Sequence, residues 1–223
     1  MKKIAFLLLV LSVFIGCNRN DDDATVAPQI GYNYFPLNIG STWIYKVDSI
    51  AYDDNGPSQA IDTFYYQYKE HIAETIEDDM GQPLYIINRY YRMHDSDTWQ
   101  QVRNFAAQIV DNKAKRVEEN NRFVRLVFPL KARNMWDGNL FNAQGNQIYK
   151  IVEFETPYVF QNNTVKSVKV EESNVSNFIE EIKRYQTYAE NIGRVELMYD
   201  SLNTQTSGTK GFRYKLSLTS YTP

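Results

Sequence analysis

Few residues in this chain are of the types that enzymes use for catalysis or metal binding. Its 223 residues include one cysteine, Cys17, and two histidines, His71 and His94. Two histidines are too few for the usual multi-histidine metal site, so we predict neither a metal ion nor another cofactor. The sequence also lacks a nucleophile elbow around a serine, a zinc-binding pair of histidines on a helix, a phosphate-binding glycine loop and a dinucleotide fingerprint. The single cysteine excludes a disulfide framework.

The 27 acidic residues could supply the two facing carboxylates with which glycosidases cleave a sugar bond. Glu153 and Glu155 share one face of a predicted strand, and Glu118 lies close to Arg116 in another. We interpret these residues as solvent-exposed strand positions. The sequence therefore identifies no catalytic residue, and a carboxylate-dependent glycan hydrolase is kept only as an alternative function.

Tryptophan rings can stack on sugar rings, and the chain has three tryptophans. Trp43 lies in a strongly alternating segment and is predicted to belong to the core. Trp136 lies in a loop-like stretch and is the best candidate for an exposed ring, with Trp99 as a second candidate. These two residues are the candidates for stacking on a ligand.

The first seventeen residues have the pattern of an export signal. Residues 1–3 carry two lysines, and residues 4–15 form an apolar run that only Ser12 interrupts. This run is shorter than the roughly 20 residues that a membrane-spanning helix needs, and its length is typical of a secretory signal. Residues 14–17, with the sequence Phe-Ile-Gly-Cys, resemble the lipobox of bacterial lipoproteins.

The lipobox resemblance implies a defined set of modifications at Cys17. In lipoproteins the thiol of this cysteine is alkylated with diacylglycerol, the chain is cut before it, and the new amine is acylated. The resemblance therefore implies that residues 1–16 are a signal peptide and that Cys17 binds the membrane through its acyl groups. Several acyl chains hold a protein firmly, whereas a single chain holds it marginally. The alternative is an ordinary cleaved signal followed by a cysteine without lipid.

Residues 17–33 lack apolar periodicity and are predicted to be a flexible tether. Asp21, Asp22 and Asp23 follow the cysteine closely. Such acidic residues resemble the export signal that directs Bacteroidetes lipoproteins to the outer face of the outer membrane. The resemblance implies a lipid-anchored outer-membrane protein at the cell surface. The alternative is a solvated linker on a protein that faces the periplasm.

The remaining residues, 34–223, are predicted to form a single β-rich domain. Strict alternation places Trp43, Tyr45 and Val47 on one face of a half-buried strand. The Asn-Gly pair at residues 55–56 favours a hairpin directly after this strand.

Further strand-like runs follow, among them residues 84–93 and 113–118, and short polar turns separate them. Strands joined in this way form antiparallel meanders, and aromatic residues on both strand faces indicate that both faces are partly covered. We therefore predict a mainly β fold. It is a strongly curved antiparallel meander sheet or an open β-barrel, with at most one or two short helices.

Two phrases of the domain resemble those of uncharacterised Bacteroidetes envelope lipoproteins. The first phrase, residues 34–47, contains Phe-Pro-Leu followed by glycine, tryptophan and tyrosine, and the second phrase, residues 188–195, contains Tyr-Ala followed by glycine. Arg194 stands where the second phrase usually has an apolar residue. The resemblance implies a location and a fold, but no known activity.

The segment 176–190 fits two structures. Apolar residues recur at helical spacing from Phe178 to Ala189, behind Ser176, which could cap a helix. The same residues also alternate as a strand that leads into a turn at residues 191–193. The residues alone favour a helix slightly, whereas the resemblance favours a strand hairpin.

Composition and charge exclude several classes of function. Hydrophobic residues make up 43% and charged residues 23% of the chain, which excludes a disordered or fibrous protein. The formal net charge of −3 argues against nucleic acid as a partner. The sequence therefore favours a non-catalytic binding or assembly module with an envelope protein or a glycan as its partner. The alternatives are a carrier that encloses an apolar ligand in a half-barrel, and the glycan hydrolase.

Overall fold

The computed structural model describes residues 30–53, 60–204 and 208–223. The predictions for the signal peptide, for Cys17, for the aspartates at 21–23 and for the turn at 55–56 fall outside the described residues. The same is true of most of the predicted tether.

Regular structure in the described residues consists of strands and one short 3₁₀ turn, without an α-helix. The elements, in chain order, are η1 (Tyr32–Tyr34), β1 (Thr42–Asp53), β2 (Ala60–Glu77), β3 (Pro83–Arg92), β4 (Gln100–Val110), β5 (Lys113–Glu118), β6 (Asn121–Val127), β7 (Met135–Asp137), β8 (Ile148–Phe160), β9 (Asn163–Ser176), β10 (Glu180–Ala189), β11 (Gly193–Asn203) and β12 (Lys210–Thr222). The predicted mainly β fold is confirmed.

These strands form one antiparallel sheet in the order β6-β5-β4-β3-β2-β1-β12-β11-β10-β9-β8-β7. Strands that follow one another in the chain are neighbours, except that β6 and β7 form the two edges. The first and last strands, β1 and β12, pair in the middle of the sheet, where Thr42 faces Thr222. The sheet therefore consists of two meanders joined along β1 and β12.

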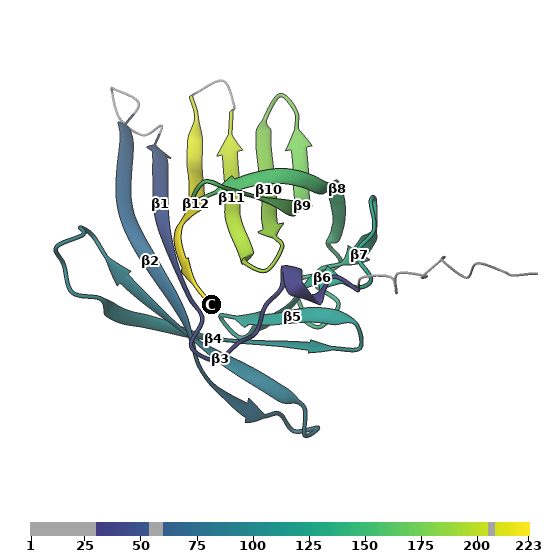
Figure 1. The fold of residues 1–223 in the computed structure, drawn as a ribbon. Coiled ribbons are helices and arrows are strands. Elements are labelled where there is room, and N and C mark those ends of the chain that lie inside the picture. Colours follow the sequence, from purple (N-terminus) through teal and green to yellow (C-terminus); the bar gives the residue numbers. More distant parts are fainter. Residues whose placement is uncertain (1–29, 54–59, 205–207) are drawn as a thin grey trace, which may run out of the picture.

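The connection between β6 and β7 requires the sheet to curl. Only seven residues separate Val127, the last of β6, from Met135, the first of β7. This length reaches at most about 28 Å, whereas a flat sheet of twelve strands would hold its edges about 50 Å apart. Figure 1 shows the result, a nearly closed, barrel-like sheet in which β4 and β5 face β10 and β11 across the interior. The predicted strong curvature is confirmed.

The two edges of the sheet meet at a seam between β6 and the residues around β7. The backbone N–H of Val124 donates to the carbonyl of Gly138 at 2.8 Å, and the indole N–H of Trp136 donates to the carbonyl of Val124 at 2.8 Å. Trp136 is only 9% exposed and packs edge-on against Tyr149. A side chain at position 138 would overlap the Tyr149 ring, which explains the glycine. The prediction that Trp136 is an exposed ring is wrong, because its indole fills the core and closes the seam.

The core lies on the inner face of the curled sheet. Trp43, Tyr45 and Val47 are buried while Lys46 between them is exposed, which confirms the predicted alternation. On the neighbouring strand β2, Ile72 is fully buried in the same cluster. Period-two patterning therefore determines which residues of each strand enter the core.

The first and second phrases noted in the sequence pack against each other. The indole of Trp43 donates to the carbonyl of Ile192 at 2.6 Å, and the hydroxyl of Tyr45 donates to the carbonyl of Arg194 at 3.0 Å. Gly193, between Ile192 and Arg194, has a φ of +89°, a backbone conformation that residues with a side chain rarely adopt. The N-terminal segment, residues 30–41, is held against the turn between β10 and β11, because the backbone N–H of Asn191 donates to the carbonyl of Asn33 at 2.8 Å.

The segment 176–190 is mainly strand, and the helical alternative is wrong. β10 pairs with β9 on one side and with β11 on the other. Phe178 lies in the turn before β10 and is 98% exposed, so it belongs to no buried face. Two ladders of interstrand hydrogen bonds outweigh the local helical spacing, because tertiary context overrides weak propensities.

Replacing Trp136 with phenylalanine should lower the free energy of unfolding by about 1–3 kcal/mol, because the buried carbonyl of Val124 loses its donor. Urea unfolding followed by circular dichroism measures this change. The matched control is Trp99→Phe, which alters a half-buried ring in a loop and should change the free energy by less than about 0.5 kcal/mol. If both substitutions lowered the unfolding free energy equally, the hydrogen bond at the seam would not stabilise the fold.

Candidate functional site

Charged side chains from six strands meet inside the curled sheet. We call them the ionic network: Glu70 of β2, Arg89 of β3, Arg116 and Glu118 of β5, Arg125 of β6, Glu172 of β9 and Arg194 of β11. Alternation places Glu70 on the same face of β2 as Tyr68 and Ile72, which pack in or against the core. The curl of the sheet then brings residues from distant strands into contact.

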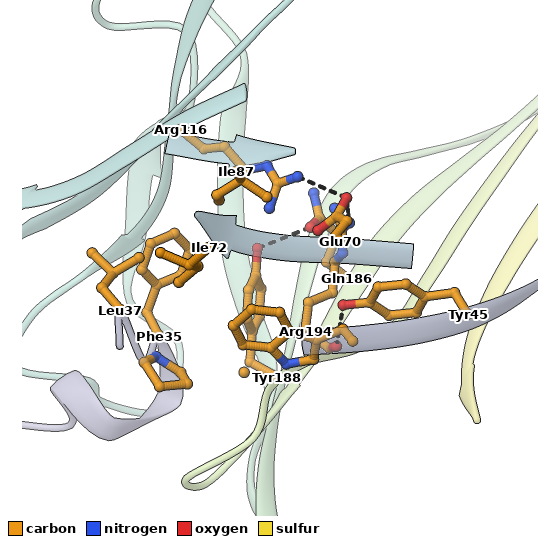
Figure 2. Close-up of a pocket in the computed structure, with 13 residues that line it drawn as sticks. Phe35, Leu37, Tyr45, Glu70, Ile72, Ile87, Arg116, Gln186, Tyr188 and Arg194 are labelled. Atoms are coloured by element: carbon orange, nitrogen blue, oxygen red, sulfur yellow. Dashed lines mark hydrogen bonds and ion pairs between the residues drawn. The ribbon is translucent and has the colours of Figure 1, made fainter. Parts of the chain in front are cut away.

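Glu70 is the centre of the network. Its Oε1 accepts hydrogen bonds from Arg89 at 2.5 Å, from Arg116 at 2.8 Å and from Arg194 at 3.1 Å. Its side chain is only 3% exposed. Figure 2 shows Glu70 between Arg116 and Arg194, above the ring of Tyr45. One carboxylate therefore neutralises part of the charge of three guanidiniums from three strands.

Glu118 and Glu172 continue the network towards β9. Glu118 contacts Arg116 at 2.6 Å and Arg125 at 2.7 Å, and Arg125 also contacts Glu172 at 2.9 Å. Gln186 of β10 donates to the same oxygen of Glu172 at 2.5 Å. The charges thus form a continuous chain across the interior rather than separate pairs.

The network holds Glu70 and Glu118 in the ionised form. Burial alone would raise the pKa of Glu70, but the three guanidiniums around it outweigh burial and hold its pKa well below the usual range. Burial also opposes ionisation of Glu118, and the guanidiniums of Arg125, Arg116 and Arg194 outweigh it and lower its pKa from 4.5 to about 2. Neither carboxylate can therefore donate a proton near neutral pH.

Arg184 of β10 lies beside the network without joining it. Its guanidinium stacks on the ring of Tyr199 at 3.7 Å from the ring centroid and donates to the Tyr199 hydroxyl. No carboxylate of the described residues forms an ion pair with Arg184. Burial lowers the pKa of this guanidinium, and the nearby carboxylate of Glu172 opposes that effect. Arg184 therefore adds a positive charge that the network does not balance.

Two adjoining cavities lie beside the ionic network, one of about 210 Å³ and one of about 350 Å³. We call the combined space of the two cavities the interior hollow. The residues that line both cavities are Glu118, Phe123, Gln144, Leu197 and Tyr199. Arg125, Arg184 and Tyr149 line the smaller part, and Arg89, Arg194 and Tyr214 line the larger part. Small-molecule sites typically measure roughly 300–1,000 Å³, so the larger part alone has room for a ligand.

A third cavity lies between the network and the N-terminal segment, with Glu70 in its wall (Figure 2). Phe35, Leu37 and Tyr188 form its apolar wall, while Glu70 and Arg116 form its polar wall. Its volume of about 40 Å³ suits a few water molecules but not an organic ligand. The interior hollow is therefore the better candidate for a binding site.

Of the tryptophans and acidic residues singled out in the sequence and described by the structure, only Glu118 lines the interior hollow. Trp136 closes the seam, and Trp99 lies half-buried in the loop between β3 and β4, where the guanidinium of Arg92 stands 4.3 Å from its ring. A stacking role for Trp99 stays a prediction. Glu153 and Glu155 are exposed, as expected.

The interpretation of Glu118 and Arg116 as solvent-exposed positions is wrong. Both side chains lie on the inner face of β5, where Arg116 is only 7% exposed. Sequence reasoning also missed Glu70, which sits in a run of aromatic residues. The one signal for the network was Arg194, a charged residue in a phrase that usually has an apolar residue at this position. A charge at an inward position must be paired, so its presence predicts partners.

Neither histidine takes part in a candidate site. The ring Nδ1 of His71 lies 3.0 Å from the hydroxyl of Thr42, and His94 is exposed in the loop after β3. The described residues contain no group of three or more histidine, cysteine or acidic side chains that could hold a metal ion. No helix in the described part of the chain is long and apolar enough to cross a membrane.

No family model matches the chain, and no curated protein matches it. Among solved structures, it is similar to a protein from Parabacteroides distasonis that is provisionally described as a lipoprotein. The two chains are 12% identical and align with a TM-score of 0.47 over 85% of this chain and 98% of the other. A likeness of this degree assigns neither a family nor a function.

Replacing Glu118 with glutamine should lower the free energy of unfolding by about 3–5 kcal/mol at pH 7, because it leaves buried guanidiniums short of a counter-charge. The pKa of Glu118 in the folded protein lies below its ordinary value, so its ionisation stabilises the fold above about pH 4.5. This contribution is lost as the pH falls from about 4.5 towards 2. The difference in unfolding free energy between wild type and variant should therefore become smaller over this pH range. Urea unfolding measures this difference.

Glu153→Gln is the matched control, because Glu153 forms an exposed ion pair with Lys169 at 3.3 Å. It should change the unfolding free energy by less than about 0.5 kcal/mol at pH 7. If the difference in unfolding free energy between wild type and Glu118→Gln stayed constant down to about pH 2.5, the assignment of a charged network would be contradicted.

Proposed function

We propose that this chain is a lipid-anchored protein of the outer membrane whose β-rich domain binds a small ligand in the interior hollow without transforming it. The observation that carries this proposal is the hollow itself, about 350 Å³ in its larger part and lined by guanidiniums and aromatic rings. A cavity of this size with a few convergent polar groups is the usual form of a small-molecule site.

The state of the carboxylates favours binding over hydrolysis. A glycosidase needs one protonated carboxylic acid to assist the leaving group. Glu118 borders the hollow, but its pKa of about 2 keeps it ionised near neutral pH. Glu172 also borders the hollow and accepts from Arg125 and Gln186. Glu118 therefore serves as a partner of guanidiniums rather than as a proton donor, and the contacts of Glu172 are likewise those of a partner of Arg125.

The charge of the lining disfavours an apolar ligand. Arg125 and Arg194 border the hollow and are 94% and 93% buried. Seating a hydrocarbon against them would remove water from these charges without replacing its hydrogen bonds, which is costly. A polar ligand supplies the missing partners, so the alternative of an apolar carrier is the weaker one.

The sequence supports the location. Residues 14–17 resemble a lipobox with Cys17 as the acylated residue, and the aspartates at 21–23 resemble a surface-export signal. Between Cys17 and the first described element, η1, lie fourteen residues. Such a tether would let the domain stand clear of the lipid surface while the acyl groups hold it there.

Gln144 offers a direct test of the binding site, because it is exposed and lines both parts of the interior hollow. Replacing it with tryptophan should block the hollow while leaving the fold intact, since exposed positions tolerate substitution. Native mass spectrometry of the protein mixed with small molecules extracted from bacterial envelopes measures retention. The wild type should retain a ligand of unchanged mass, and the variant should not.

Ala143→Trp is the control for bulk, because Ala143 is exposed in the same turn and lines neither part of the hollow. It should retain the ligand. Retention by Gln144→Trp would place the ligand elsewhere, and release of a cleaved molecule would favour the hydrolase instead.

Replacing Cys17 with alanine should abolish incorporation of an acyl-chain analogue in growing cells and release the protein from the membrane. The circular dichroism spectrum should stay that of a β-rich protein, because Cys17 precedes every described element. Alanine substitution of all three aspartates at 21–23 is the companion variant, which should keep the label but lose protease accessibility on intact cells. Labelling of the Cys17→Ala variant would refute the lipid anchor.

A further inference from the structure

We infer that the ligand of the interior hollow is a small anion with a ring-shaped body, such as an acidic sugar, whose anionic group pairs with Arg184. This inference rests on the proposed function and names the ligand class of the same site. The anionic group is a carboxylate, sulfate or phosphate, because all three present oxygens in the geometry that a guanidinium binds.

The charges around the hollow do not balance. Five guanidiniums and three carboxylates of the described residues face this part of the interior: Arg89, Arg116, Arg125, Arg184 and Arg194 against Glu70, Glu118 and Glu172. Glu119 also lines the larger part, but it is exposed and pairs with Arg103 at 3.0 Å. The interior therefore carries an excess of positive charge, which an anionic ligand would offset.

Buried donors without partners lie beside the same space. The Nε–H groups of Arg125, Arg184 and Arg194 have no hydrogen-bond partner among the described residues. Arg125 and Arg194 are more than nine-tenths buried, where an unpaired donor costs about 1–3 kcal/mol. Both arginines also border the hollow, so an anion placed there would offset part of the charge that these incompletely paired guanidiniums carry.

Arg184 is the guanidinium most available to a ligand. It is half-buried, and the ring of Tyr199 holds it in place at 3.7 Å. Glu172 is the carboxylate that affects it most, but Glu172 already accepts from Arg125 at 2.9 Å and from Gln186 at 2.5 Å. Arg184 thus keeps its charge free for an incoming anion.

The aromatic lining favours a ligand with a ring. Phe123 and Tyr199 border both parts of the hollow, Tyr149 borders the smaller part, and Phe105 and Tyr214 border the larger part. Aromatic faces pack against the C–H face of a sugar, while the Tyr hydroxyls supply hydrogen bonds to its hydroxyl groups. A bare inorganic ion would use the guanidiniums but not these rings.

Isothermal titration calorimetry of the full mature chain in non-ionic detergent tests the inference, with glucuronate, glucose and inorganic sulfate as probes. Glucuronate should bind more tightly than either of the other two. Arg184→Gln should weaken glucuronate binding by about 10-fold to 100-fold, as expected for loss of one charge-assisted contact. Arg184→Lys should retain part of the affinity, because it keeps the charge.

Lys183→Gln is the matched control, because Lys183 is exposed on the opposite face of β10 and pairs with Glu181 at 2.7 Å. It should leave the affinity unchanged. Urea midpoints of all variants verify that each is folded, since Arg184 forms no ion pair within the described residues whose loss would unfold the sheet.

Three outcomes would overturn the inference: no binding of either anion, equal affinity for glucuronate and glucose, or an unchanged affinity in Arg184→Gln. Sulfate binding without glucuronate binding would reject the ring-shaped body. Glucose binding that is as tight as glucuronate binding and that Gln144→Trp abolishes would reject the anion while leaving the proposed function intact. The proposed function fails separately, if Gln144→Trp retains every ligand that the wild type retains.

Discussion

The rest of the structure depends on the ion pairs that the buried carboxylate of Glu70 forms with three arginines. Two of its guanidinium partners, Arg89 and Arg116, belong to the same meander as Glu70, and the third, Arg194, belongs to the other. A carboxylate this deeply buried loses several kcal/mol of hydration, which only close and multiple donors can offset. β1 and β12 lie between β2 and β11 in the sheet, so Arg194 reaches Glu70 over two strands, and a curled sheet with a concave inner face shortens this reach. The ion pairs of Glu70 and the short connection between β6 and β7 thus both favour a curled sheet.

Around this centre the interior is arranged in layers of different chemistry. Phe35 and the N-terminal segment form an apolar layer against the turn between β10 and β11, and the ionic network follows. Beyond the network lies the interior hollow, where Tyr199 and Arg184 face open space. A core built only of aliphatic side chains would have no reason to leave this space. The charged layer prevents collapse, because closing over it would strand guanidiniums without partners.

Strands with a clear alternation of their own were predictable. Residues 113–118 were expected as a strand from their pattern and form β5 with the same bounds. The network was not predictable, because alternation tells which face a residue occupies but not which distant strand faces it. The burial of Trp136 was not predicted, because β7 has only three residues and is followed by Gly138. A strand this short shows no recognisable alternation. The segment that forms β10 was ambiguous for a related reason: its partners, and not its own residues, decide its conformation.

The pairing of β1 with β12 has a consequence for how the chain reaches its folded state. Thr42 and Thr222 are partners, so the middle of the sheet is assembled from segments at opposite ends of the described fold. Such a topology has a high contact order, and chains of high contact order fold slowly. During synthesis the first meander emerges with its central edge unpaired, and it stays incomplete until the last strand has been made. The export proposed for this chain requires it to cross a membrane as an extended polypeptide, and this topology would keep it from folding too early.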